Sequence, residues 1–349
     1  MASYQNQKMR ALIFFLCFGF MARGQNISSW QITRSNSIEV STPACHAATL
    51  EEVSPGHLVS AWFGGQYEGS NDVGIYLAHF KNNGWSIPQR ILSPHIIQQD
   101  TLPLWNPVLF KSAQGILYLF YKYGKNPREW LGAFITSNDL GESWSQPQNL
   151  PDGFLGPIRN KPLEVSPGII LFGSSTESIE NDLWRVHLER FNEKNSYWEK
   201  ISVPNPKNLD VIQPTFLSHG GNKIQILCRS RHNRVISSWS SDRGKIWGPL
   251  DSLQLIHSNS GIDAETISKT DFLLVNNPLL KGEEWYVGRN VLSVEYSMDG
   301  LQWKTILDLE NEPKGEFSYP AIKKTLDGKV HILYTFNRKK IKHVELERH

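Results

Sequence analysis

The stretch that decides the fold runs from Ser137 to Trp144 and reads SNDLGESW. Its fixed positions form the pattern Ser-x-Asp-x-Gly-x-x-Trp, with Asp139 and Gly141 between the two ends. An Asp in this place accepts hydrogen bonds from the backbone N–H groups that follow it, and a Gly adopts the positive φ that a tight turn requires. We expect the Trp ring to pack under the turn and to begin the next strand. The pattern therefore predicts a tight hairpin.

The same pattern returns along the chain. One further full copy and one copy that is shorter by a residue are present: Ser240, Asp242, Gly244 and Trp247, then Ser297, Asp299, Gly300 and Trp303. Two other stretches keep only the end of the motif: Asn83-Gly84-Trp85 and Asn195-Ser196-Tyr197-Trp198. The Trp residues recur about every 55 residues, a period that is typical of propeller blades.

Apolar runs give an independent count of the repeats. Six runs have the length of strands: 57–62, 116–121, 168–172, 224–228, 272–275 and 330–334. Six runs and five turns predict an all-β fold, a six-bladed β-propeller in which residues 25–40 supply the outer strand of the last blade. A β-sandwich is the alternative, but it does not account for the long repeat.

Composition and the N-terminal segment define the class of protein further. The 349 residues carry a formal net charge of +2 without a basic run, so we expect no nucleic-acid partner. Lys8 and Arg10 precede an apolar run at residues 11–21, which is too short to span a membrane. We therefore expect residues 1–24 to be a signal peptide and residues 25–349 to be a single domain, exported to the periplasm or secreted, free of the membrane and monomeric.

Cysteine and metal-ligand patterns are sparse. Cys45 and Cys228 remain after removal of the leader, and whether they form a disulfide is left open. The sequence has no zinc-type cluster of Cys and His, so we expect no cofactor and assign no metal ligands. It has no calcium-ligand motif either, and whether Ca²⁺ binds is left open.

Polar side chains follow the apolar runs at equivalent places. They include Glu68, Asp72, Lys122, Glu177, Arg229, Arg231, Asn276, Asn277, Thr335, Asn337 and Arg338. In a propeller these strand ends converge on one mouth of the central channel, and convergent polar groups on a concave surface are the default binding site. Exposure of strand ends to water explains the Asn and Ser residues at these places, but it accounts less well for Arg229, which ends a buried run.

The Ser-x-Asp-x-Gly-x-x-Trp repeats resemble the Asp boxes of the sialidase (neuraminidase) superfamily. More narrowly, the chain resembles exported sialidase-like proteins with Asp-box repeats. The runs that carry the resemblance are Trp62-Phe63-Gly64-Gly65, Trp105-Asn106-Pro107, Asn160-Lys161-Pro162, Ser230-Arg231 and Ser318-Tyr319-Pro320. The resemblance covers nearly everything after residue 40 and implies a six-bladed propeller that acts on an anionic sugar.

The resemblance implies a set of residues that bind the substrate carboxylate. Sialidases hold it with three Arg side chains, because the planar guanidinium forms two parallel hydrogen bonds to a carboxylate. Arg229 and Arg289 match the second and third of these, and His46 stands where the first would be. Arg159, Lys161 and Arg231 are further candidate cations.

The resemblance also implies the reacting groups. Tyr319 matches the nucleophile, which the family activates with a Glu, but that place here holds Gln213, which cannot take a proton. Asp72 matches the acid/base, with Glu68 a competitor in the same loop. Three other carboxylates are candidates to replace the missing base: Glu177, Glu265 and Glu316.

Three hypotheses follow. The first is an exo-acting glycoside hydrolase of sialidase type, in which Tyr319 attacks the anomeric carbon and Asp72 protonates the leaving oxygen. The second is a lyase on a uronic acid, in which His46, Arg229 and Tyr319 need no Glu partner. The third is a propeller that binds glycans without catalysis.

Overall fold

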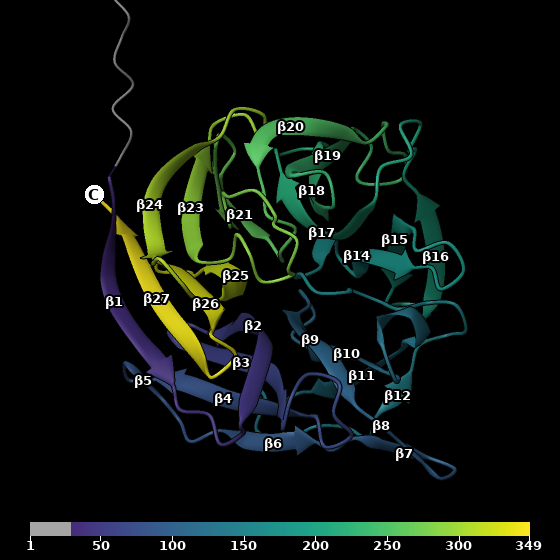
Figure 1. The fold of residues 1–349 in the computed structure, drawn as a ribbon. Helices are drawn as coiled ribbons and strands as arrows, with labels where there is room; N and C mark the ends of the chain where they lie inside the picture. The colour runs from purple at the N-terminus through teal and green to yellow at the C-terminus, as the bar shows by residue number, and fades with distance from the viewer. Residues whose placement is uncertain (1–28) are drawn as a thin grey trace, which may run out of the picture.

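The computed structural model describes residues 29–349, which form six antiparallel sheets around a central axis (Figure 1). One short 3-10 helix, η1 (Pro127–Glu129), interrupts the strands. The six-bladed propeller that the repeats predict is therefore confirmed. The predicted signal peptide lies outside the described residues, and within residues 29–349 no helix is long and apolar enough to cross a membrane.

Each blade is a sheet whose first strand lies nearest the axis. Blade 1 contains β2 (Ala44–Ser54), β3 (His57–Gly65), β4 (Gly74–Lys81), β5 (Gly84–Trp85) and β6 (Gln89–Leu92). Blade 2 contains β9 (Leu104–Lys111), β10 (Leu117–Tyr123), β11 (Leu131–Ser137) and β12 (Gln148–Asn149), and blade 3 contains β13 (Leu163–Ser166), β14 (Ile169–Glu177), β15 (Trp184–Asn192) and β16 (Tyr197–Ser202). Blade 4 contains β17 (Val211–Ser218), β18 (Ile224–Ser230), β19 (Arg234–Ser240) and β20 (Asp251–Ile256), and blade 5 contains β21 (Asp263–Ser268), β22 (Asp271–Asn276), β23 (Val291–Ser297) and β24 (Lys304–Asn311). Blade 6 contains β25 (Phe317–Lys324), β26 (Val330–Phe336), β27 (Lys340–Arg348) and β1 (Trp30–Ile38), and a separate hairpin, β7 (His95–Ile97) with β8 (Asp100–Leu102), joins blades 1 and 2.

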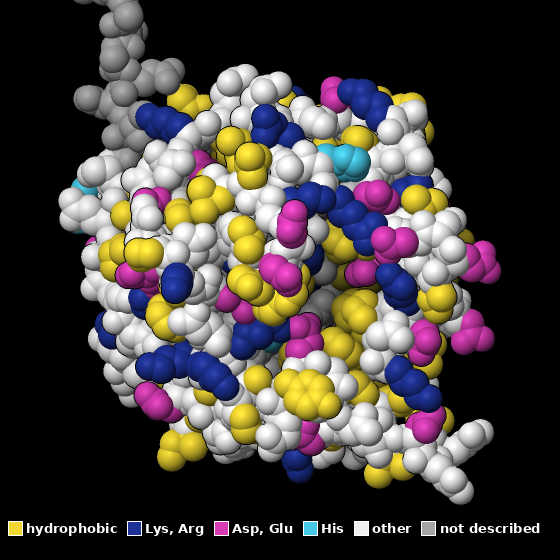
Figure 2. Space-filling view, viewed as in Figure 1, with side chains coloured by type: hydrophobic (Ala, Val, Ile, Leu, Met, Phe, Trp, Pro, Cys, Tyr) yellow, Lys and Arg dark blue, Asp and Glu magenta, His cyan; other side chains and the backbone are white. Residues whose placement is uncertain are grey.

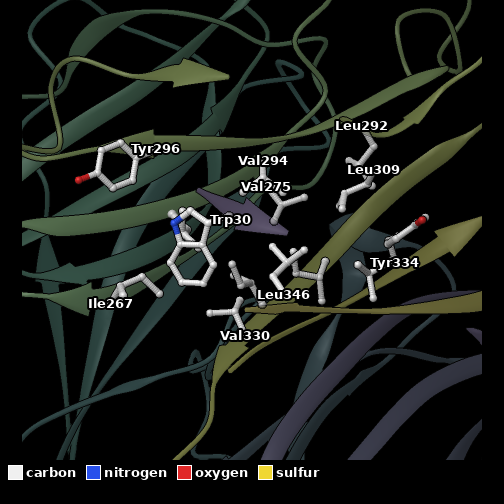
Figure 3. Packing of buried hydrophobic residues seen from close by; sticks show 14 of the residues in the cluster. Trp30, Ile267, Val275, Leu292, Val294, Tyr296, Leu309, Val330, Tyr334 and Leu346 are labelled. Carbon is white, nitrogen blue, oxygen red and sulfur yellow. The ribbon is translucent and has the colours of Figure 1, made fainter. Parts of the chain in front are cut away.

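The two ends of the described chain meet in blade 6. Strand β1 pairs antiparallel with β27, from Trp30 opposite Arg348 to Ile38 opposite Ile341. This is the closure predicted for residues 25–40, and it completes the four-stranded sheet of blade 6, in which β1 is the outer edge strand. The Trp30 ring packs among side chains of blades 5 and 6, which fastens the closing strand to its neighbour (Figure 3).

The hydrophobic core lies between the blades. Six clusters of buried apolar side chains each join two neighbouring blades, because every sheet packs face to face with the next one. The second strand of a blade is covered on both faces, and every residue of β10 is buried. This explains why the second strands read as continuous apolar runs in the sequence, whereas the outer strands do not.

The Asp boxes form turns at the outer ends of the blades. In the first box, Ser137 Oγ donates to Asp139 at 2.7 Å, and the Trp144 indole N–H donates to the carbonyl of Gly141 at 3.1 Å. Gly141 has a φ of 91°, as predicted. The expectation that the Trp begins the next strand is wrong for this box, since β12 starts at Gln148. The indole is bound to the turn's own carbonyl, so Trp144 still belongs to the turn.

The two cysteines do not pair. Cys45 lies in the cluster between blades 6 and 1, and Cys228 lies in the cluster between blades 3 and 4. Burial raises the pKa of the Cys45 thiol to about 12, and burial also raises the pKa of Cys228. Both therefore behave as small apolar core residues.

Candidate active site

The first strands of four blades share an irregularity near the mouth of the channel. Two consecutive residues leave the ladder in each, and the first of them has a positive φ: Ala47, Asn106, Gln213 and Tyr319, with φ values of 54°, 39°, 55° and 54°. In three of the four cases the second residue is a Pro. Such bulges redirect a side chain and cost backbone strain, and they concentrate at functional sites.

Tyr319 is the residue on which side chains from several blades converge. Its hydroxyl accepts a hydrogen bond from Arg229 Nη1 at 2.8 Å. The guanidinium carbon of Arg159 lies 5.0 Å from the centre of its ring, and the imidazole of His46 lies 4.1 Å from it, centre to centre. The space-filling view shows a hollow at the centre of the ring of blades, with basic, acidic and hydrophobic side chains around it (Figure 2). The structure thus brings four of the predicted residues together.

Arg229 and Arg159 are buried and are bound by neutral groups. Arg229 Nε donates to Asn259 Oδ1 at 2.9 Å, and its Nη1 is also 3.3 Å from Gln213 Oε1. Arg159 donates to the carbonyls of Ile262, at 3.0 Å, and of Pro320. Burial lowers the pKa of Arg159 to about 10, so it stays charged at neutral pH. Among residues 29–349, neither guanidinium forms an ion pair.

Two other arginines share one carboxylate. Glu316 lies between Arg289 Nη1, at 3.2 Å, and Arg338 Nε, at 2.9 Å. Arg338 also pairs with Glu68. The exposed indole of Trp285 covers both guanidinium groups, at 5.1 Å from Arg289 and 4.7 Å from Arg338. The charges of this second pair are therefore already compensated within the protein.

His46 is buried and neutral. Its Nδ1 lies 2.9 Å from Thr335 Oγ1, and its Nε2 is buried without a hydrogen-bond partner. Burial lowers the pKa of the imidazole well below its usual range, and four nearby guanidinium groups, Arg338 first, lower it further. In this state burial and those cations disfavour a proton on the ring, and binding of the substrate carboxylate by His46 stays a prediction.

The two carboxylates of the loop after β3 are engaged differently. Asp72 accepts hydrogen bonds from Ser70 Oγ and from the backbone N–H of Gln66, at 3.0 Å, and these hydrogen bonds lower the pKa of its carboxyl. Glu68 is held by Arg338. Within the described chain neither carboxylate is hydrogen-bonded to Tyr319. Asp72 therefore holds the loop in this state, and acid catalysis by either residue stays a prediction.

Lys161 and Arg231 are both paired with carboxylates. Lys161 Nζ lies 3.0 Å from Asp263 Oδ2 and 3.5 Å from Glu265 Oε2. Asp263 also accepts a hydrogen bond from the backbone N–H of Ile322, so this group ties blades together around the channel. Arg231 pairs with Asp182 at 3.0 Å. A direct role of Lys161 or Arg231 in substrate binding stays a prediction.

Three carboxylates are the candidate replacements for the missing base: Glu177, Glu265 and Glu316. Glu316 is bound by two guanidinium groups, and Glu265 lies beside Lys161. Burial raises the pKa of Glu265 and also that of Glu177, whose neighbours are Arg229 and Arg231. Within residues 29–349 no carboxylate is hydrogen-bonded to the hydroxyl of Tyr319, so none of them takes the place of the missing Glu in this state.

The sequence did not assign a site role to Arg338 or Trp285. Arg338 was noted only as a polar residue after the sixth run, and it follows Asn337, both with positive φ in the turn between β26 and β27. Trp285 lies in the loop between β22 and β23, outside every Asp box. The repeated X-Pro pairs at residues 106–107, 213–214 and 319–320 are a sequence signal for the bulges, because they occupy the same place in three blades.

In the described part of the chain, no group of three or more His, Cys, Asp or Glu side chains is arranged to hold a metal ion.

Comparisons with known proteins agree with the architecture. The family described as the BNR repeat-like domain matches residues 56–332. A Dyadobacter fermentans protein of unknown function has a similar structure, with a TM-score of 0.71 and 15% identity, covering 92% of this chain and 100% of that one. The NanB sialidase from Streptococcus pneumoniae aligns with a TM-score of 0.67 and 13% identity, covering 91% of this chain and 70% of that one. The Trypanosoma rangeli sialidase in complex with sialic acid aligns with a TM-score of 0.65 and 14% identity, covering 91% of this chain and 57% of that one. No curated protein matches the chain.

The ring of six blades, the Asp boxes and the arginine-lined mouth define a sialidase-like propeller. The chain belongs to the family of BNR repeat-like domain proteins, whose pattern spans more than half of its length. At 12–15% identity the solved structures establish the fold, and the reaction has to be argued from the site.

Proposed function

We propose that the protein is a glycosidase that removes a terminal anionic sugar, sialic acid or a similar acid, from a glycan. The single observation that carries this proposal is the hydrogen bond from Arg229 to the Tyr319 hydroxyl. It holds a phenol, at a strained position of an inner strand, among buried cations at the mouth of a sialidase-like propeller. A sugar that carries a carboxylate would find cations that can bind that group beside a phenol that can act as the nucleophile.

The reaction would proceed in two displacements. Tyr319 Oη attacks the anomeric carbon, the bond to the leaving oxygen breaks, and Asp72 or Glu68 supplies the proton to that oxygen. Water then cleaves the bond between the sugar and Tyr319. A phenol suits this role because a carboxylate nucleophile would be repelled by the carboxylate of the substrate. Since Gln213 cannot take the phenol proton, that proton leaves to water, and Arg159 and Arg229 stabilise the phenolate.

Turnover of a fluorogenic α-sialoside tests the proposal. The purified protein is expected to release the fluorophore, and the Tyr319→Phe variant is expected to release none. Mass spectrometry of the freed sugar should show the one water that hydrolysis adds. Failure of the wild type to act on any sialoside or related anionic glycoside would contradict it. The same release by Tyr319→Phe would exclude Tyr319 as the nucleophile.

A second candidate, a lyase that acts on a uronic acid, is favoured by the state of His46. The ring is neutral, its Nε2 has no partner, and it packs against Tyr319. Once the carboxylate of the bound substrate offsets the guanidinium charges that disfavour a proton on the ring, Nε2 would take the proton from C5. The electron pair would form the C4–C5 double bond, and the C4–O bond would break. The leaving oxygen would take the proton of the Tyr319 hydroxyl, and Arg229 would neutralise the carboxylate. An unsaturated product that absorbs ultraviolet light distinguishes this reaction from hydrolysis.

Export is part of the same proposal. Lys8, Arg10 and the apolar run at residues 11–21 support a leader that ends at Gly24. Expression of the full chain in a bacterial host, followed by N-terminal sequencing of the exported protein, is expected to give Gln25 as the first residue. An intact chain that stays in the cytoplasm would contradict export.

A further inference from the structure

Asp263, the first residue of β21, is a buried carboxylate on which donors from several blades converge. Its Oδ1 accepts hydrogen bonds from the Thr215 hydroxyl, at 2.7 Å, and from the backbone N–H of Ala264, at 2.9 Å. Its Oδ2 accepts from the backbone N–H of Ile322 and from Lys161 Nζ, both at 3.0 Å. These four donors use the acceptor sites of both oxygens. The side chain therefore joins blades 4, 5 and 6 to the segment that leads into blade 3.

The strands that Asp263 binds are the two that carry Gln213 and Tyr319. Thr215 is the residue at which β17 rejoins its ladder after the bulge at Gln213. Ile322 lies one residue beyond the point at which β25 rejoins its ladder after the bulge at Tyr319. Because β25 is the inner edge of its sheet, backbone N–H groups on that edge need partners outside the sheet, and Asp263 supplies one. Asp263 therefore fixes both strands directly after their bulges.

The chain just before Asp263 supports the ring of Tyr319. A methyl group added to Gly261 would lie 3.1 Å from Tyr319 Cγ, so the backbone of this glycine is packed closely against the ring. Gly261 precedes Asp263 by only two residues. A displacement of Asp263 would therefore reach Tyr319 by two routes, through the backbone of β25 and through the chain that lies against the ring.

The contact that these supports maintain is sensitive to small shifts. Arg229 Nη1 donates to the Tyr319 hydroxyl at 2.8 Å and lies 3.3 Å from Gln213 Oε1. One nitrogen atom thus contacts both bulged residues, which come from blades 4 and 6. A relative shift of the strands by about 1 Å would lengthen at least one of these distances beyond that of a hydrogen bond. The spacing of β17 and β25 therefore decides whether Tyr319 stays bound.

A second buried ion pair on the inner strands is linked differently. Glu51 of β2 pairs with Lys323 of β25 at 2.5 Å, and it also accepts from the backbone N–H of its neighbour Glu52. Glu51 thus reaches β25 through a flexible side chain. Asp263 binds the backbone of that strand directly, at Ile322. Glu51 and Asp263 are similarly buried, so burial of a charge alone does not distinguish them.

We propose that Asp263 is a positioning residue for the site: its bonds to β17 and β25 set the distance between the two bulges, and this distance keeps the Tyr319 hydroxyl on Arg229. Lys161 balances the charge of Asp263 and holds its Oδ2 in place. Asp263 acts through these residues and need not touch the substrate. The inference rests on the proposed function only in its measurement of turnover, because the state of Tyr319 can be followed without a substrate.

Asp263→Asn tests the proposal, because an amide of the same size offers one acceptor oxygen to the four donors. In protein labelled with ¹³C at the ring carbon that bears the tyrosine hydroxyl, the Tyr319 signal is the one that is missing from Tyr319→Phe. Asp263→Asn should move or broaden this signal, since the hydrogen bond from Arg229 is weakened. For turnover of a fluorogenic α-sialoside, kcat should fall about 10- to 100-fold, with KM changed by less than about threefold.

Glu51→Gln is the matched control, since it also removes the charge of a buried carboxylate that is paired with a Lys among the inner strands. It should lower Tm to a similar extent as Asp263→Asn, because each variant breaks a buried ion pair. It should leave both the Tyr319 signal and kcat at their wild-type values.

Thr215→Val is a milder variant that removes only the link between Asp263 and β17. The backbone N–H of Ala264, which also donates to the Thr215 hydroxyl, keeps Asp263 as an acceptor, so this buried donor is not left without a partner. The Tyr319 signal should move less than in Asp263→Asn, and kcat should fall by about three- to tenfold. Thr215→Ser keeps the hydroxyl and should restore both values.

Two results overturn the positioning role. The first is a Tyr319 signal and a kcat in Asp263→Asn that match the wild type, which would make Asp263 part of the core packing only. The second is an equal change in Glu51→Gln, which would show a general loss of stability. If Asp263→Asn does not fold, Thr215→Val decides, and a wild-type Tyr319 signal in that variant overturns the role. If the signals change as expected but the wild type cleaves no anionic glycoside, Asp263 keeps its role and the proposed glycosidase function fails.

Discussion

The Asp-box turns and the mouth of the channel are both built from short motifs that repeat from blade to blade, yet their contacts differ in range. In the second box, Ser240 Oγ accepts from the backbone N–H of Gly244, four residues away. At the mouth, Tyr319 is held by Arg229, ninety residues away. The contacts of a box form within eight consecutive residues, whereas the contacts of the mouth form only when the blades close into a ring. Changes in a box should therefore affect stability, and changes at the mouth should affect ligand handling.

The largest expected effect is at the mouth. Tyr319→Phe removes the hydroxyl oxygen that accepts the hydrogen bond from Arg229. This change should lower turnover of an anionic glycoside by at least about 10³-fold. Thermal unfolding should be nearly unchanged, because the aromatic ring and its packing remain. Steady-state kinetics and calorimetry measure the two quantities.

Tyr296→Phe is the control for this prediction. Its hydroxyl donates to Asp271, which begins β22 at the end of that strand opposite Asn276, so its removal should leave turnover per folded molecule unchanged. Equal activity of Tyr319→Phe and the wild type would remove Tyr319 from the reaction.

The next effect is on stability, at a box. Gly244 has a φ of 78°, and a methyl group there would lie 2.6 Å from a methyl carbon of Leu171. Gly244→Ala should lower the free energy of unfolding by about 2–4 kcal/mol, from backbone strain plus overpacking. Denaturant titration measures this loss.

Gly328→Ala is matched to that variant. Its φ is 88° and the space beside it is open, so only the strain of about 1 kcal/mol should remain. Equal losses in the two variants would show that packing under the box contributes nothing.

A smaller effect concerns pH. The backbone N–H of Ile246 donates to Asp242 and, with other donors of the box, lowers the pKa of that carboxyl. A carboxyl with a lowered folded-state pKa contributes stability above its unfolded pKa of about 4, and the contribution is lost as the pH falls through the folded value. Asp242→Asn should therefore cost about 1 kcal/mol at neutral pH and flatten the loss of stability below about pH 4.

Urea titrations from neutral to acid pH measure this difference. An unchanged slope in Asp242→Asn below pH 4 would show that the carboxyl is not stabilised by the turn.

The smallest expected effect is at His46. Because burial and the neighbouring guanidinium groups lower its pKa, the ring is neutral throughout the range from about pH 6 to 8. Affinity for a sugar carboxylate should therefore vary by less than about twofold across that range. A fall in affinity with rising pH that disappears in His46→Gln would show instead that a charged His46 binds the carboxylate.

The fold was predictable because its signals are local. The Asp boxes fix the turns between strands, and the apolar runs mark the second strands, which are covered on both faces. Even the closing strand could be expected, since six runs and five turns leave one strand unmatched. The one error concerns Trp144, which was expected to begin a strand. Its indole N–H donates to the carbonyl of Gly141, and this hydrogen bond keeps the residue in the turn.

The candidate site was predictable only in part. Tyr319, Arg229, His46 and Arg159 were named from the sequence, and the structure brings them together. The balance of charge at the mouth could not be foreseen, because it depends on Glu316, which pairs with Arg289 of the neighbouring blade and with Arg338 of its own blade. Similarly, the loop that carries Asp72 has its own hydrogen bonds, and these set the state of that carboxyl.

The sequence by itself determined the number of blades, the turns and the residue types available at the mouth. These features depend on residues close to one another in the sequence and on whether one or both faces of a strand are buried. Only the tertiary structure decided which cations at the mouth form ion pairs and which, beside Tyr319, are bound by neutral groups. The physical reason is that charge compensation acts through space over a few ångströms, and closure of the ring sets those distances between residues that lie in different blades.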